Sequence, residues 1–159
     1  RTRERPFVPR PTIDRMLDIM PSPRLVIHEF KSHGTCSGLA PDAYFDLARK
    51  LFGRIAIPAR YRNTAEPLTT SPAEVEREFL TANPKLKADM LAVVCGKPNR
   101  LREIRICFSP GGELRSCGGN EDQSRLCKSD RIIMPPVRGK ALGKGGDPVF
   151  NGANDDNPI

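Results

Sequence analysis

The sequence has no tryptophan and only two tyrosines beside seven phenylalanines. A platform of stacked aromatic side chains for single-stranded nucleic acid is therefore poorly supported. The sequence also has no run of about 18 consecutive apolar residues, which is the length that spans a bilayer, and no basic segment followed by an apolar one at its start. We expect a soluble chain with no membrane attachment and, if it is exported, one that has already been processed.

The five cysteines form no Cys-X-X-Cys pair, although zinc sites usually contain such tight pairs. They are Cys36, Cys95, Cys107, Cys117 and Cys127, and the last four fall within one window of 33 residues. This clustering favours two local disulfides and one cysteine whose partner lies outside the chain. It predicts an oxidising compartment, so the protein is expected to be secreted, periplasmic or in an endomembrane lumen. Reduced cysteines buried in a cytosolic protein are the alternative.

The chain is basic, with 26 Lys and Arg against 19 Asp and Glu and a formal net charge of +7. This charge favours polyanionic partners, although most basic surfaces are only solvated. The length of 159 residues and 38% hydrophobic content suit one compact domain, expected over residues 12–137. Residues 1–11, with four Arg and three Pro, predict an extended arm that continues from a missing upstream segment. Residues 138–159 predict a disordered tail.

Apolar residues at helical spacing predict helices over residues 12–20, 23–36 and 40–53. Thr12 is the expected N-cap of the first helix. Ser71, three residues before Glu74, predicts a capped fourth helix that ends near residue 83. Residues 90–95, 101–107 and 131–134 predict strands, the first two joined by a turn at residues 96–99. This order predicts an α+β fold, with helices packed on one side of an antiparallel sheet.

Both histidines of the chain lie in one predicted helix, five residues apart. On that helix an arc of about 140° contains four polar side chains, those of His28, Glu29, Ser32 and His33. A zinc site of the His-Glu-X-X-His type needs its histidines four residues apart, so we expect no metal. The alternative is that these residues are ordinary surface groups.

The stretch from His28 to Cys36, HEFKSHGTC, resembles the second catalytic segment of the ribonuclease T2 family, commonly HEWxKHGTC, with every spacing kept. The helix-rich first part and the cysteine-rich second part extend the resemblance over about residues 12–137. It implies a ribonuclease T2-like fold and an endoribonuclease that cleaves single-stranded RNA. In that reaction the ribose 2′-hydroxyl attacks the neighbouring phosphate, which gives a 2′,3′-cyclic phosphate and a free 5′-hydroxyl without metal or cofactor.

Carried over by position, the resemblance implies roles for three residues. His33 would be the general base, Glu29 would orient groups and stabilise the transition state, and His28 would bind the phosphate. The imidazole pKa lies near working pH, which suits such roles. The resemblance, with the cysteine spacing, also favours the disulfide pairs Cys95 with Cys127 and Cys107 with Cys117.

Two departures from the family pattern affect the expected site. The family's lysine before the second histidine is Ser32 here, and Lys31 stands one residue earlier. The long stem of Lys31 either brings its ammonium group to the phosphate or leaves it solvated on an exposed face.

The second departure is that an HGLWP-like segment, which carries the family's general acid, is absent from the sequence. We expect an upstream segment or a second chain to supply this acid and a cysteine partner for Cys36. His28 does not readily substitute for the acid, because it shares a helix face with the base, whereas the leaving oxygen lies on the other side of an in-line phosphate. The chain alone is then inactive. The alternative function is a catalytically inactive RNA-binding or interaction protein with the same fold.

Overall fold

The computed structural model describes residues 6–119 and 126–136. These residues form two compact units, a helical unit up to Arg54 and a sheet unit from Ile55 onward. Each unit buries apolar residues of its own, and the prediction of one domain over residues 12–137 stays a prediction. The predicted tail at 138–159 and residues 1–5 of the predicted arm lie outside the described residues.

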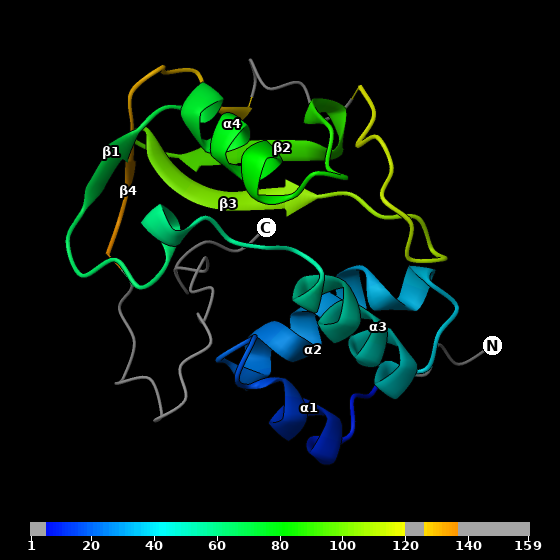
Figure 1. Ribbon diagram of the computed structural model, residues 1–159. Coiled ribbons are helices and arrows are strands. Elements are labelled where there is room, and N and C mark those ends of the chain that lie inside the picture. The colour runs from blue at the N-terminus through cyan, green and yellow to red at the C-terminus, as the bar shows by residue number, and fades with distance from the viewer. Residues whose placement is uncertain (1–5, 120–125, 137–159) are drawn as a thin grey trace. The chain divides into compact units, whose positions relative to one another are not determined.

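Three α-helices make up the helical unit: α1 (Arg10–Met16), α2 (Pro23–Ser32) and α3 (Pro41–Gly53) (Figure 1). Each has a proline in its first turn, where no intrahelical N–H bond is lost. The prediction for α1 was wrong at both ends. Residues 10 and 11, assigned to the arm, are helical, and Thr12 is not the N-cap. Pro9 occupies that position, while Thr12 is buried and its hydroxyl donates a hydrogen bond to Asp42.

The core of the helical unit is a cluster of six buried side chains, Val8, Ile13, Met16, Val26, Phe30 and Phe45. The ring of Tyr44 packs edge-on against Phe30, with centroids 5.6 Å apart, and against Phe45 at 5.1 Å. Arg49 on α3 adds an ion pair of 2.6 Å with Asp18. This packing fixes α2 against α1 and α3.

In the described residues, the named elements of the sheet unit are four strands and helix α4 (Figure 1). In chain order they are β1 (Leu68–Thr70), α4 (Pro72–Ala82), β2 (Leu91–Gly96), β3 (Arg100–Ile106) and β4 (Ile132–Met134). The strand order is β1-β4-β3-β2. α4 begins where the capping pattern predicted, because Ser71 Oγ accepts a hydrogen bond of 3.1 Å from the backbone N–H of Glu74.

The sheet is mixed, so the prediction of an antiparallel sheet was wrong in part. β1 pairs with β4, and β2 with β3, in antiparallel fashion, whereas β3 and β4 are parallel. β2 already occupies one edge of β3, and the long connection after β3 returns β4 to the other edge in the same direction. The fold class remains α+β. Within the sheet unit, α4 is the helix that packs on β2.

Hydrogen bonds and disulfides hold the sheet unit together around its core. The rings of Tyr61 and Phe79 stack with centroids 6.2 Å apart, and Asn83 bonds through its side chain to both the N–H and the C=O of Ala56. The disulfides join Cys95 to Cys127 and Cys107 to Cys117, which are the two pairs that the resemblance favoured. In the chain-entropy model they stabilise the fold by about 4 and about 3 kcal/mol. Among the described residues, no helix has the length and apolarity to cross a membrane.

Candidate active site

Helix α2 carries His28, Glu29 and Ser32 of the predicted arc, His33 follows as its C-cap, and the apolar face of α2 fixes how the helix is oriented. Ser22 caps the helix by accepting a hydrogen bond of 3.4 Å from the backbone N–H of Leu25. Val26 is fully buried, and Phe30 is 5% exposed. Because Phe30 packs against Tyr44 and Phe45, the opposite face of α2 is presented to solvent.

The helix ends earlier than predicted, at Ser32 rather than near Cys36. His33 is the C-cap, with φ −127° and ψ −45°, and a 3₁₀ turn follows at Gly34–Cys36. Gly34 lies close to the aromatic ring of Phe30, four residues earlier. A Cβ atom at Gly34 would lie 2.8 Å from Phe30 Cε2, so a larger residue here would crowd the ring.

The histidines and their partners form two neighbouring contacts on the exposed face. Glu29 Oε2 lies 3.9 Å from His33 Nε2, and His28 Nε2 lies 3.5 Å from Ser32 Oγ. Each contact joins residues four apart, one turn along the chain. The side chain of His33 is 67% exposed and that of Glu29 is 31% exposed. Both groups are therefore accessible to a solute, and the carboxylate is the more restrained.

Tyr44 is a further residue near the carboxylate that the sequence did not single out. The pKa of its phenol is raised, first by burial and then by the negative charge of Glu29. Glu29 thus lies between an exposed imidazole and the aromatic cluster. In the sequence, the spacing of Tyr44 indicates only that it belongs to the apolar face of the third helix. No sequence signal therefore predicts that Tyr44 lies near Glu29.

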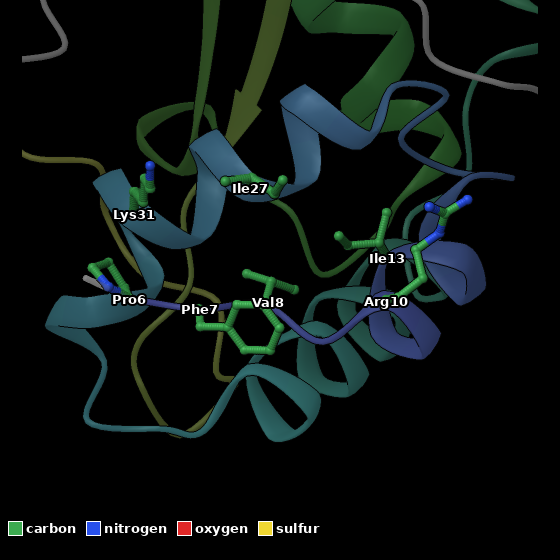
Figure 2. A pocket seen from close by; sticks show the side chains of 7 residues that line it. All are labelled: Pro6, Phe7, Val8, Arg10, Ile13, Ile27 and Lys31. Carbon is green, nitrogen blue, oxygen red and sulfur yellow. The ribbon is translucent and has the colours of Figure 1, made fainter. Parts of the chain in front are cut away.

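The structure places Lys31 beside a shallow apolar groove of the helical unit (Figure 2). The groove is lined by Pro6, Phe7, Val8, Arg10, Ile13, Ile27 and Lys31. Lys31 therefore shares a side of α2 with Ile27, one turn earlier. The paired side chains on the exposed face are those of Glu29 with His33 and His28 with Ser32.

Cys36 has a free, exposed thiol at the end of the 3₁₀ turn that follows His33. Within residues 6–119 and 126–136, no cluster of three or more His, Cys, Asp or Glu side chains is arranged to hold a metal ion. No family model, no curated protein and no solved structure matches this chain.

Proposed function

We propose that the protein is an endoribonuclease that cleaves single-stranded RNA by the acid–base chemistry of ribonuclease T2 enzymes. The observation that supports this proposal is the exposed pair of Glu29 and His33, 3.9 Å apart, with His28 on the same face. A base, a carboxylate that restrains it and a second imidazole are the groups that activation of a ribose 2′-hydroxyl beside a phosphate requires.

In the proposed reaction the His33 imidazole takes the proton of the 2′-hydroxyl at Nδ1, because its Nε2 faces Glu29, and the 2′ oxygen forms a bond to phosphorus. The bond from phosphorus to the 5′ oxygen breaks, and that oxygen takes a proton from an acid. Glu29 holds the His33 ring and stabilises the imidazolium that forms. His28 donates a hydrogen bond to a non-bridging phosphate oxygen. The products are a 2′,3′-cyclic phosphate and a 5′-hydroxyl.

A second candidate function is RNA binding without cleavage. Both histidines of the sequence stand on one short segment, and an in-line displacement needs its acid on the side of the phosphate opposite to the base. The HGLWP-like segment that carries this acid in the resembling family does not occur in these 159 residues. The two candidates differ in whether the bound RNA is cut.

The test is RNA cleavage by the full gene product and by the 159-residue chain. The substrate is a single-stranded oligoribonucleotide, and its fully 2′-O-methylated copy is the control, because methylation removes the attacking hydroxyl. In the presence of a chelator, we expect mass spectrometry to detect cyclic-phosphate ends from the unmethylated RNA and none from the methylated copy. His33→Ala should remove this cleavage, and Lys50→Ala on α3 should leave it unchanged.

Cleavage that survives in His33→Ala, or cleavage of the methylated copy, would contradict the proposal. Tight binding of RNA by both polypeptides without any cut ends would replace it with the second candidate.

A further inference from the structure

The sheet unit carries a row of side chains that the proposed site does not use. Thr69, Ile133, Arg100 and Gly96 are register partners across β1, β4, β3 and β2. Register partners lie on the same face of a sheet, so this row crosses all four strands. Ile133, a member of this row, is 43% exposed, whereas the side chain of Ile132, which points to the other face of the sheet, is completely buried. The row therefore lies on a solvent-accessible part of the sheet.

A β-bulge lies next to this row on β3. Val94 pairs with Glu103 and Cys95 with Leu101, so Arg102 is the extra residue of the bulge. In a bulge, two residues of one strand oppose a single residue of the partner strand. Arg102, two residues after Arg100, therefore has no register partner on β2. Arg100 and Arg102 are both exposed.

The basic charges here are not balanced by acids. Within the described residues, the side chains of Arg100, Arg102 and Arg131 make no hydrogen bond or ion pair. The acid on this part of β3, Glu103, is engaged by Arg105 at 2.6 Å. Arg131 directly precedes β4, two residues before Ile133. We call Arg100, Arg102, Arg131 and Ile133 the arginine face.

We infer that the arginine face binds the backbone of single-stranded RNA, as a surface separate from the groups on α2. This inference rests on the proposed function for its choice of polyanion. Each guanidinium group offers a planar fork of donors that matches a phosphate. Arg100 and Arg102 lie two residues apart on β3, at the bulge, so their guanidinium groups are close enough in the chain to serve neighbouring phosphates of one strand. The exposed Ile133 offers apolar contact to a ribose or a base.

The exposed apolar residue among the arginines favours RNA over an acidic protein. A polynucleotide carries flat apolar rings beside its charges, whereas acidic side chains carry none. Unstacked bases also stack on guanidinium planes, so an arginine beside an exposed apolar residue can contact both parts of a nucleotide.

The test measures equilibrium binding of a fully 2′-O-methylated single-stranded oligonucleotide at several salt concentrations. The probe cannot be cleaved, so binding is read independently of catalysis. The variant is R100Q/R102Q/R131Q. The charge-matched control is K50Q/K85Q/K87Q, whose lysines are exposed outside the arginine face. Circular dichroism and thermal unfolding confirm that both variants fold.

We expect the arginine variant to bind about tenfold more weakly or worse. The plot of log K against log salt should become less steep, with the magnitude of its negative slope reduced by about 2. Each lost phosphate contact on a single strand contributes about 0.7 to that magnitude. The control should keep the parent slope. Equal weakening in both variants, or none in the arginine variant, would overturn the inference. Tighter binding of polyglutamate than of the oligonucleotide would assign the surface to an acidic protein instead and also overturn it. Binding through the arginine face by a protein that cuts no RNA would sustain this inference while the proposed cleavage fails.

Discussion

The carboxylate of Glu29 lies 3.9 Å from Nε2 of His33, although His33 has already left the α-helix to which Glu29 belongs. The backbone N–H of His33 still donates a hydrogen bond of 2.9 Å to the carbonyl oxygen of Glu29. One residue pair is thus joined through both backbone and side chain. The position of the imidazole depends on how α2 terminates as well as on the helix itself.

The carboxylate should matter to catalysis through its charge. We expect Glu29→Gln, which keeps the shape of the side chain, to lower kcat for RNA cleavage by about tenfold or more, since positioned acid–base groups contribute on the order of 10²-fold. KM should change little. Steady-state kinetics on a dinucleotide substrate measures both constants. Glu76→Gln on α4 is the control, and an equal loss in that variant would contradict the assignment.

Ser32 and Lys31 should respond differently to substitution. Ser32 contacts His28 on the exposed face of α2. Ser32→Lys therefore places a cation beside the proposed phosphate-binding residue and should increase kcat/KM for RNA. Lys31→Ala should leave kcat/KM near the parent value, because Lys31 lies beside the groove with Ile27. A large loss in Lys31→Ala would show instead that its ammonium group reaches the substrate phosphate.

Gly34 should be intolerant of a methyl group. The added Cβ of Gly34→Ala would lie within 3.0 Å of ring atoms of the core residue Phe30. Crowding of a packed core costs about 1–3 kcal/mol, so the free energy of unfolding in urea should fall by that amount. Gly53→Ala is the matched control, because nothing lies within 4 Å of its Cβ. That change should raise stability by up to about 1 kcal/mol, the helix preference of Ala over Gly.

Both tyrosines should titrate above their ordinary range in the folded protein. Burial, followed by the hydrogen bond with Glu78, raises the pKa of Tyr61 from 10.0 to about 12, and the pKa of Tyr44 is also raised. The folded state therefore holds the phenol proton of Tyr61 more tightly than the unfolded state does. The resulting stabilisation is complete below pH 10.0 and is lost as the pH rises towards about 12.

Ultraviolet absorbance of tyrosinate measures this directly. At pH 10 the folded chain should show little tyrosinate, whereas the chain in urea should be about half ionised. Tyr61→Phe should remove the phase with the higher pKa and leave that of Tyr44. Half-ionisation of both tyrosines near pH 10 in the folded protein would contradict the prediction.

Local patterns in the sequence predicted the elements whose signals are local. The Ser71 cap fixed the start of α4, and alternation with the turn at residues 96–99 predicted the β2–β3 hairpin. β1 was missed because three residues carry no period. The parallel pairing of β3 with β4 was also missed, since it depends on the path of a long connection rather than on either strand.

The same distinction applies to the candidate site. The spacing of the four residues predicted that His28 and Ser32, and likewise Glu29 and His33, lie close together on one helix face. It did not predict that the helix ends at Ser32, although Gly34, two residues later, is of the type that commonly follows a helix end. The proximity of Tyr44 to Glu29 depends on how α3 packs against α2.

Both cystine bridges lie in the sheet unit. Residues 6–54, which hold the two imidazoles, contain Cys36 as their single sulfhydryl. The helices that carry the proposed chemistry are thus maintained by aromatic packing and charge pairing, which thiol reductants do not attack. Thiol reductants act on the two bridges of the sheet unit, and Cys36 is the sulfhydryl through which redox conditions reach the histidine-bearing segment.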